Sequence, residues 1–491
     1  MLDWIQTHIP AWVYITVIVH VTILGSVAYM ILLERKIASW VQDRIGPNRV
    51  GFDFGIIPFL KGFTFNGLGQ PLADGLKFIF KEDYEPLGVD KILFTLAPGL
   101  MIFVIIISIA VIPWGGYLGE QSTMDVPASA IGNPRAYIEQ HLPVFEKLIG
   151  DPQPNGTKGT FTSAFSGSAQ FNYIHGWAFQ IADLNIGVFY ILAVLSLAVY
   201  GVVIGGWASN NKYSFLGALR ATANMISYEI PLGLAVLTIV LMFGTLDLGV
   251  IVERQAHNWG GFLPAWNVFC QPLAFLMFLV CIHAEANRAP FDLAEAEQEL
   301  VGGYHTEYSS MRFALFFLSE YAGMITTSAV CVALFFGGWD LPGLRGPIAE
   351  HPSVTSSLLV CLIRALVFYG KTMIVIFVFM WVRWSLPRFR FDQLMMMAWR
   401  ALIPISLAGM LATAIVIACF PPGGRDYDLD INGYMALSLL GANIVVLVGS
   451  MWISRLLPPP PDTNRRVKVL NSRFNRPPLP AGPNGSALPT V

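Results

Sequence analysis

Charged side chains are scarce in this sequence. Of its 491 residues, 13% are Asp, Glu, Lys or Arg and 55% are hydrophobic, and the mean hydropathy is +0.58. So little polar surface cannot cover a soluble globule of this size, which predicts an integral membrane protein. The formal net charge of −2 hides an uneven distribution of charge along the chain. No nucleic-acid partner is expected.

Cysteine is also rare, and the common motifs of metal and nucleotide sites are missing. The five cysteines lie inside or at the edge of apolar stretches, without C-x-x-C spacing: Cys270, Cys281, Cys331, Cys361 and Cys419. They are interpreted as small core residues, so neither a disulfide framework nor a cysteine-held redox centre is predicted. A Walker A loop, a G-x-G-x-x-G fingerprint, an H-E-x-x-H helix and a G-x-S-x-G elbow are absent too. The chain is expected to bind no metal and no redox cofactor of its own.

What the sequence has instead is a series of apolar stretches. These lie near residues 11–33, 92–112, 186–207, 224–246, 270–284, 313–338, 358–382, 401–420 and 432–454. A helix is the open-chain element that satisfies its own backbone in hydrocarbon, so the sequence predicts an all-α membrane protein of about nine transmembrane helices. The 270–284 stretch is short, and its helix is expected to continue into the next segment or to end within protein.

Positive residues indicate the orientation of the helices. Eight follow the first span, and the segments 208–223, 283–312 and 383–400 and the tail from Arg455 onward add two, two, four and six, about 22 of the 30 in all. The positive-inside rule then places the N-terminus outside and the C-terminus in the cytoplasm, in a bacterial inner membrane. No basic region precedes the first apolar run, so we expect a first helix there rather than a cleaved signal peptide.

These features divide the chain into five parts. The 113–185 segment is rich in Gly, Ser, Asn and Pro and is expected to be a loop or a partly disordered cap on the outer side. The parts are the first two spans with their inner loop (1–112), a polar outer insert (113–185), a core bundle with an acidic loop at 285–308 (186–420), an additional C-terminal helix (421–457) and a basic, Pro-rich cytoplasmic tail (458–491).

The acidic loop follows directly on an apolar run. Asp292, Glu295 and Glu299 are spaced to share one helical face, and Glu297 lies on another. Carboxylates crowded at low dielectric repel each other's charge and titrate as a unit. The simpler interpretation is a solvated acidic loop on the cytoplasmic face, but apolar residues are interspersed through the segment. We therefore predict a proton-handling cluster.

Further acids lie within the predicted spans. Glu229 begins the apolar part of the fourth span, Glu285 ends the fifth and Glu320 lies in the sixth, with Lys371 near the middle of the seventh. An ionised carboxylate at bilayer depth costs several kcal/mol unless it meets water or a partner. Each acid could be satisfied by a neighbouring helix. Their similar depth indicates instead a buried polar path across the bundle.

The first inner loop carries a different pattern. Residues 67–83 place Asp74, Lys77, Lys81 and Glu82 among apolar side chains. Such a segment predicts an amphipathic helix lying flat at the interface, which could form the floor of a cavity open to lipid. An ordinary surface anchor is the alternative.

Nine motifs occur in order between residues 32 and 396: LLERK, RIGPNRVG, QPLADGLKFIFKE, GWASNNKYSFLGALR, ISYE, EANRAPFDLAEAEQELV, TEYS, SEYAGM and PRFRFDQLM. The set resembles the membrane subunit of respiratory complex I, the proton-translocating NADH:quinone oxidoreductase, that forms the quinone chamber. In that family quinone is the substrate, and FMN and iron–sulfur clusters belong to partner subunits. The expected partners are those peripheral-arm subunits, small membrane subunits and lipid.

The resemblance also implies roles for individual residues. The quinone tunnel and its inner-loop entrance would involve Glu34, Arg35, Arg44, Asp74, Glu82 and Arg288. The proton-coupling path would involve Glu229, Glu285, Asp292, Glu295, Glu297, Glu299 and Glu320. The PRFRFDQLM motif would help to hold the inner loops to the peripheral subunits.

The chain departs from the family pattern at some points. Asn224 stands where glutamine is common and Ser310 where glycine is common, and a ninth helix and a basic tail follow the usual eighth helix. Two alternatives stay open. The first is the equivalent subunit of a membrane-bound hydrogenase or of a dehydrogenase with another donor. The second is a stand-alone ion-coupled transporter, against which stands the lack of a detectable inverted repeat.

Overall fold

The computed structural model describes most of the membrane-spanning part of the chain. Contacts divide the chain into two units, Met1–Leu447 and Val448–Val491. In the second unit, only the last turns of one helix are described. The described residues are 11–51, 65–127, 133–142, 147–154, 168–256, 258–259, 263–292, 301–341, 354–355, 357–419 and 433–456. The predicted tail, 458–491, lies outside them.

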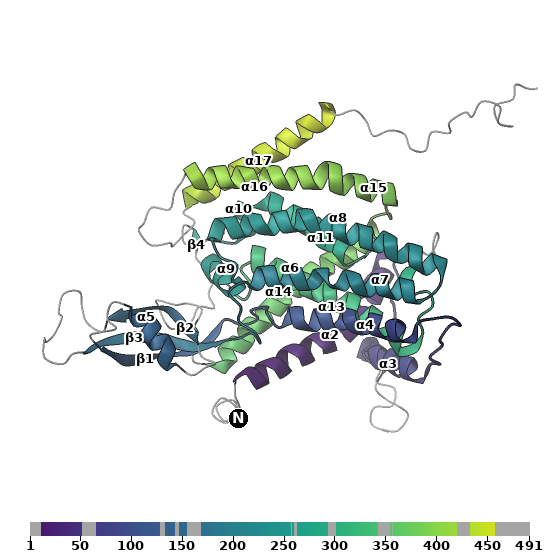
Figure 1. Cartoon of the computed structure of the whole chain (residues 1–491), viewed down its shortest axis with the longest axis horizontal. Helices are drawn as coiled ribbons and strands as arrows, with labels where there is room; N and C mark the ends of the chain where they lie inside the picture. The colour runs from purple at the N-terminus through teal and green to yellow at the C-terminus, as the bar shows by residue number, and fades with distance from the viewer. Residues whose placement is uncertain are drawn as a thin grey trace, which may run out of the picture. The chain divides into compact units, whose positions relative to one another are not determined.

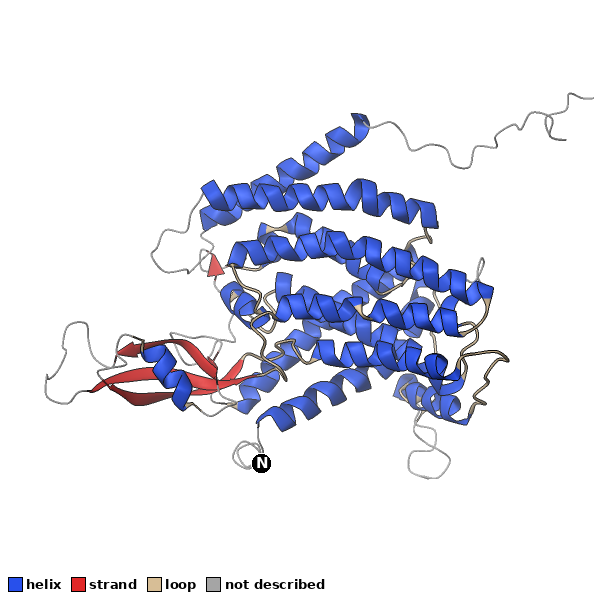
Figure 2. Cartoon of the chain, in the orientation of Figure 1, coloured by secondary structure: helices blue, strands red, loops and turns tan. Residues whose placement is uncertain are grey.

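Long helices dominate the described residues (Figures 1 and 2). They are α2 (Ala11–Val41), α4 (Lys91–Ile109), α6 (Gly187–Ser196) with α7 (Ala198–Ala208), α8 (Lys212–Phe243), α13 (Ser310–Phe335), α14 (Leu358–Ser385), α15 (Phe391–Met396), α16 (Ile403–Cys419) and α17 (Gly433–Leu456). Within the described ranges, eight helical segments are long and apolar enough to cross a membrane. The prediction of an all-α membrane protein is confirmed.

The fifth predicted span is a broken helix. A short helix α10 (Asn267–Cys270) ends one residue before α11 (Pro272–Glu285), and Gln271 between them is not helical. The 14 residues of α11 are fewer than the roughly 20 that cross a bilayer. Of the two outcomes expected for this stretch, continuation into the next segment is not seen, because α11 ends at Glu285. Glu285 stands at its C-terminal end.

The helices approach one another closely through small residues. A Cβ atom added at Gly201 of α7 would lie 2.3 Å from the Met101 side chain of α4, and one at Gly206 would lie 2.3 Å from Cβ of Ala218 on α8. Close backbone approach through glycine is how helices pack where lipid removes the hydrophobic drive for association. The layered bundle of α4, α7 and α8 follows from these positions.

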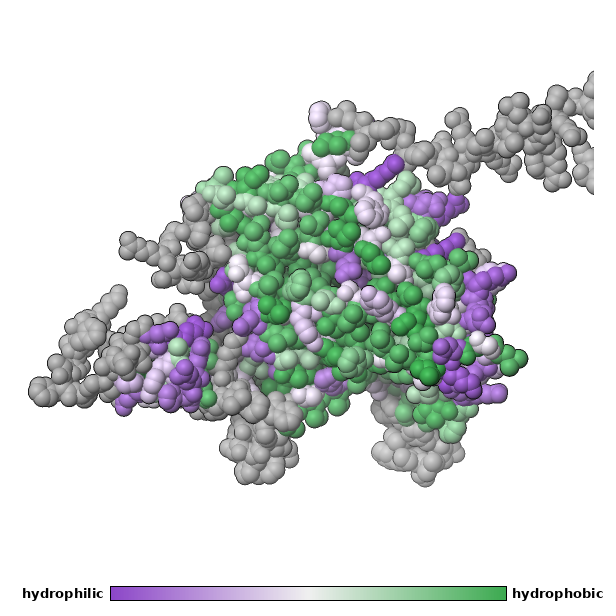
Figure 3. All heavy atoms as spheres, viewed as in Figure 1, coloured by the Kyte–Doolittle hydropathy of each residue, from purple (hydrophilic) through white to green (hydrophobic). Residues whose placement is uncertain are grey.

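Caps fix where the helices begin and end. The Asp90 carboxylate accepts hydrogen bonds from the backbone N–H groups of Ile92 and Leu93 at the start of α4. Asn211 caps α8 in the same way, and Gly244 ends α8 in the left-handed conformation. Hydrophobic side chains cover the helical region between these ends, and hydrophilic ones gather beyond it (Figure 3).

The insert at 113–185 contains a small sheet, which was not predicted from the sequence. Its elements are β1 (Tyr117–Pro127), α5 (Pro134–His141), β2 (Lys147–Pro154) and β3 (Ser168–Ala178), joined by β6 (Val354–Thr355) in the order β2-β3-β1-β6. β1 and β3 pair antiparallel, with Tyr117 opposite Ala178. A separate core of Val126, Ile138, Leu148, Phe171 and Tyr173 supports the sheet. The expected loop or partly disordered cap is therefore wrong for the described strands, because alternate apolar residues among the polar ones face this core. A second, two-stranded hairpin joins β4 (Asn258–Trp259) to β5 (Leu263–Pro264).

The predicted amphipathic segment contains helix α3 (Gln70–Phe80), which lies against α2 and α13. Leu72, Leu76, Ile79 and Phe80 are exposed along it. The helix therefore presents an apolar face that the described residues leave uncovered.

Candidate functional site

A buried group of charges lies near the C-terminal ends of α2 and α14. The Glu34 carboxylate, 6% exposed, accepts a hydrogen bond from the Tyr321 hydroxyl and is paired with the Arg383 guanidinium. Arg288 Nη1 lies 4.0 Å from Glu34 Oε2. We call Glu34, Arg288, Glu320, Tyr321, Arg383 and Tyr304 the inner ion network.

Arg288 joins the two acids of this network. Its Nη2 lies 3.2 Å from Glu320 Oε2, and the Tyr304 hydroxyl donates to Glu320 Oε1 over 2.8 Å. The guanidinium also stacks over the Tyr321 ring, 4.2 Å from the ring centre. Because Arg288 is only 4% exposed, its charge depends on these carboxylates for compensation. The network ties together α2, α13, α14 and the segment after α11.

The segment after α11 is held in place by its own contacts. Asn287 takes a positive φ of 48° and turns the chain out of the helix. The Phe389 N–H then donates to the Pro290 carbonyl, and Asp292, 2% exposed, pairs with Arg388 Nη2 at 2.9 Å. The PRFRF stretch therefore fixes the start of the acidic loop, and with it the position of Arg288.

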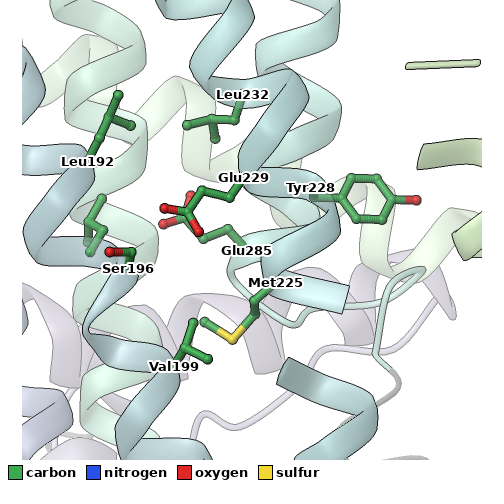
Figure 4. A pocket seen from close by; sticks show the side chains of 9 residues that line it. Leu192, Ser196, Val199, Met225, Tyr228, Glu229, Leu232 and Glu285 are labelled. Carbon is green, nitrogen blue, oxygen red and sulfur yellow. The ribbon is translucent and has the colours of Figure 1, made fainter. Parts of the chain in front are cut away.

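A second pair of acids lies between α6, α8 and α11. Glu229 lies in the middle of α8, and Glu285 ends α11. Their carboxylates point toward each other into one cavity (Figure 4). Described residues of these three helices and of α7 line the cavity: Leu192, Leu195, Ser196, Val199, Met225, Tyr228, Glu229, Leu232 and Glu285. No basic side chain is among these lining residues. Two facing carboxylates without a cation repel when both are ionised, so this acid pair is suited to holding a proton.

Neighbouring groups position the acid pair. The buried Asn224 amide on α8 donates to the Ala284 carbonyl over 3.3 Å, next to Glu285. Tyr228 points away from the cavity (Figure 4), and its hydroxyl donates to the Leu394 carbonyl at the end of α15. Glu229 is exposed in the isolated chain, whereas Glu285 is half-buried. The cavity is thus open at the side of Glu229.

The helix α3 is held to the C-terminal part of α2 and the N-terminal end of α13. Arg35 Nη1 lies 2.9 Å from Asp74 Oδ2 in a partly exposed pair. The Ser310 hydroxyl donates to the Phe78 carbonyl over 2.8 Å. These contacts hold the apolar face of α3 beside the inner ion network, because α2 carries Glu34 and α13 carries Glu320.

The chain after α3 is held to α13 by one cation. Arg312 Nη2 lies 2.7 Å from Glu85 Oε1 and 3.5 Å from Asp83 Oδ2. The hydrogen bond from Arg312 lowers the pKa of the Glu85 carboxyl below its usual value. An acid that stays ionised keeps this contact at neutral pH.

The structure sorts the predicted residues into separate groups. Glu34, Arg288 and Glu320 come together in the inner ion network, and Asp292 lies next to it with Arg388. The remaining acids and cations fall elsewhere: Glu229 with Glu285, Arg35 with Asp74, Arg44 exposed beside Gln42, Glu82 exposed with its carbonyl bonded to Ser309, and Glu295, Glu297 and Glu299 outside the described residues.

Lys371 belongs to a different place. Its Nζ lies 2.8 Å, 2.9 Å and 2.6 Å from the carbonyl oxygens of Phe336, Gly338 and Asp340, just beyond the C-terminal end of α13. A cation there complements the helix C-terminus. Lys371 therefore caps α13 rather than joining the acids.

The sequence analysis missed three members of the network, Tyr304, Tyr321 and Arg383. Arg383 counted only toward the orientation of the helices, and Tyr321 stood unremarked in the SEYAGM motif. A buried Glu34 carboxylate needs a cation and a hydrogen-bond donor, and this requirement could have indicated Arg383 and Tyr321. Among the described residues, no group of three His, Cys, Asp or Glu side chains could hold a metal ion.

The fold and the site define a multi-pass membrane protein with a buried ion network beside an amphipathic helix and a facing acid pair in its core. Comparison with known proteins gives the family. The model of the family described as NADH dehydrogenase matches residues 14–133 and 160–414. The chain belongs to this family.

Curated relatives share most of the chain, and each is a subunit of NADH-quinone oxidoreductase. The chain is 42% identical over 392 residues to such a subunit from Cytophaga hutchinsonii, covering 80% of this chain and 92% of the relative. It is 40% identical over 405 residues to the one from Flavobacterium johnsoniae (82% and 94% covered) and 41% over 406 residues to one from Koribacter versatilis (82% and 95%). The predicted identity as a membrane subunit of NADH:quinone oxidoreductase is confirmed at the level of the family.

Proposed function

We propose that the inner ion network and α3 form the membrane wall of a quinone chamber, and that the acid pair begins the path by which quinone reduction drives proton pumping. The observation that carries the proposal is the buried Glu34–Arg288–Glu320 bridge beside an interfacial helix. Buried charge of this kind is expensive in a membrane and marks functional sites more often than structural ones.

The apolar face of α3 suits the entry of a lipophilic substrate. Leu72, Leu76 and Phe80 are exposed along the helix, while the Arg35–Asp74 pair holds it against α2. An amphipathic helix with such a face lies in the headgroup region. Quinone would then enter from the bilayer between α3 and the inner ends of α2 and α13.

The chemistry of the substrate explains the charges. Reduction of a quinone to a quinol takes up two electrons and two protons, and the FMN and iron–sulfur clusters of partner subunits supply the electrons. Arg288 lies between two carboxylates that together compensate its positive charge. Its position therefore responds to any new charge in the chamber. Asp292 and Arg388 keep this segment in place.

The path to the acid pair is short along the chain. Glu285 precedes Arg288 by three residues, so a shift of Arg288 toward the chamber changes the field at Glu285. Glu285 and Glu229 then exchange a proton, and the change passes sideways to the pumping subunits as a coupling free energy.

The exposure of Glu229 indicates a partner. An ionised carboxylate in the middle of an apolar helix costs several kcal/mol when it faces lipid, yet Glu229 is exposed in this chain alone. A small membrane subunit that presents polar groups would cover it. The peripheral-arm subunits would cover the inner side, with the N-terminus outside and the C-terminus in the cytoplasm of a bacterial inner membrane.

The proposal is tested in the assembled complex. Glu320→Gln and Glu229→Gln should each lower quinone reductase turnover and proton pumping at least several-fold, because each removes a charge from the path. Glu139→Gln, in the exposed Arg135–Glu139 pair of the outer insert, is the matched control and should behave as wild type. Wild-type turnover and pumping in both test variants would refute the coupling role.

A photoreactive quinone tests the chamber separately. Labelling should fall on α3 and on the segment 286–292, and excess quinone should suppress it. Labelling confined to other helices would contradict the chamber. Mass spectrometry of the intact complex then identifies the donor module, and a donor other than an NADH-oxidising subunit would favour the hydrogenase-type alternative.

A further inference from the structure

The break between α10 and α11 needs partners for its polar groups. Gln271 has φ −127° and ψ 57°, and Pro272 follows it without a backbone N–H. Both Cys270 and Gln271 are buried, at 0% and 1% exposure. An interrupted helix inside an apolar bundle is tolerated only where neighbouring side chains satisfy the freed groups.

The partner comes from the last helix. Asn443 of α17 lies with its Nδ2 2.8 Å from Gln271 Oε1 and 3.3 Å from the Cys270 carbonyl oxygen. Gln271 in turn donates through Nε2 to the Thr413 hydroxyl of α16 over 3.0 Å. Asn443 is 5% exposed and Thr413 1%. A buried chain of hydrogen bonds therefore runs from α17 through the break to α16.

The helix that supplies this partner lies beyond the segment that the family model matches. The family model matches the chain only as far as residue 414, whereas α17 spans Gly433–Leu456. Gln271 and Thr413, by contrast, lie within the matched segment. A small cavity beside the chain is lined by Thr238 and Ser406 as well as Gln271 and Asn443, so the polar cluster also borders α8, which carries Glu229.

Because of the geometry of α11, a small rotation at the Gln271 contact displaces Glu285 of the acid pair. Gln271 stands just before the first residue of α11 and Glu285 is its last. The rise of a helix puts about 20 Å between these ends, so a tilt of about 5° at the break moves Glu285 by roughly 2 Å. Hinges at the ends of helices absorb such rotations.

We propose that α17 is a brace for the broken helix, and that Asn443 is a positioning residue that keeps Glu285 facing Glu229. The inference rests on the proposed coupling role of the acid pair. Without the amide of Asn443, the break loses a buried partner, α11 tilts, and the distance between the two carboxylates changes.

The test compares variants in the assembled complex, reconstituted in vesicles. Asn443→Leu should lower the number of protons pumped per quinone reduced at least two-fold and shift the pH profile of turnover, because the proton affinity of the pair depends on its spacing. Ser438→Ala is the control on the same helix, since among the described residues that hydroxyl donates only to the Met435 carbonyl of its own helix. It should match wild type.

Two further variants keep the test decisive. In Thr413→Val the new side chain has nearly the same shape as threonine. This variant should shift the pH profile of turnover in the same direction as Asn443→Leu by a smaller amount, and it provides the test if Asn443→Leu fails to assemble. The double variant Asn443→Leu with Gln271→Leu should pump only slightly fewer protons per quinone than either single variant, because both substitutions remove the same hydrogen-bond network.

The outcomes separate this inference from the proposed function. Wild-type pumping and pH profile in both Asn443→Leu and Thr413→Val, together with an impaired Glu285→Gln, would overturn the brace and leave the acid pair standing. A fully active Glu285→Gln would overturn the proposed function itself.

Discussion

Removal of the Arg288 charge is the strongest single perturbation of the inner ion network. In Arg288→Met, Glu320 loses its cation at 3.2 Å and Glu34 loses one at 4.0 Å, though Glu34 keeps Arg383. At an effective dielectric constant of about 20, the lost attraction to Glu320 is roughly 5 kcal/mol. Desolvation offsets part of this, and breaking a buried pair typically costs about 3–5 kcal/mol. We expect a loss of this size.

The assay is heat inactivation of the purified complex, followed by quinone reductase activity and by the amount of assembled subunit. Arg288→Met should inactivate at clearly lower temperature than wild type. The double variant Arg288→Met with Glu320→Gln should recover most of the loss in stability, because it no longer leaves a buried carboxylate without a cation. Recovery of stability without recovery of turnover would fit both parts of the account. A single variant as heat-stable as wild type, or a double variant no better than the single, would refute the reasoning.

Three further predictions concern the surroundings of the site. Ser310 has φ +52°, a backbone conformation that glycine adopts without strain. Ser310→Gly should therefore change heat stability little, because the relief of strain offsets the lost hydrogen bond to the Phe78 carbonyl, whereas Ser310→Ala should lower the free energy of unfolding by about 1–2 kcal/mol. Equal losses in the two variants would contradict this. The pKa of Glu85 is lowered from 4.5, so its contact with Arg312 stabilises the folded state above pH 4.5 and is lost as pH falls through the lowered pKa. Proteolysis near residue 85 should therefore increase on acidification in wild type and vary less with pH in Glu85→Gln; identical profiles would count against it. Lys371→Met should speed hydrogen exchange at the outer end of α13 without altering the pH profile of turnover, and an altered profile would place Lys371 in the proton path.

Hydropathy and charge predicted most of the fold. The apolar stretches correspond to the described spans, and the amphipathic pattern around Asp74 marked α3. The sheet of the insert was not predicted, because Phe171 and Tyr173 alternate within a polar, Gly-rich segment. No long run of alternating apolar residues indicates a strand there. The contact between Gln271 and the last helix was not predicted either, since a buried polar contact between helices depends on their packing and not on composition.

The site was predictable by residue type but not by grouping. Acids at bilayer depth stand out in any sequence, which is how Glu229, Glu285 and Glu320 were found, whereas Glu34 was implied by the family resemblance. Their partners did not stand out, because an Arg383 at the end of a span is typical of a membrane helix. Which acids meet depends on the rotation of each helix, so one continuous path was expected where the structure holds an inner ion network and a separate acid pair.

Infrared difference spectroscopy of the assembled complex tests the central claim most directly. Reduction of bound quinone should produce a carbonyl band of a carboxylic acid that gains or loses a proton, and that band should be missing in Glu285→Gln and shifted in Glu229→Gln. The matched Glu139→Gln complex should keep it unchanged. A wild-type spectrum without such a band, or the same band in all three variants, would contradict a proton change at the acid pair.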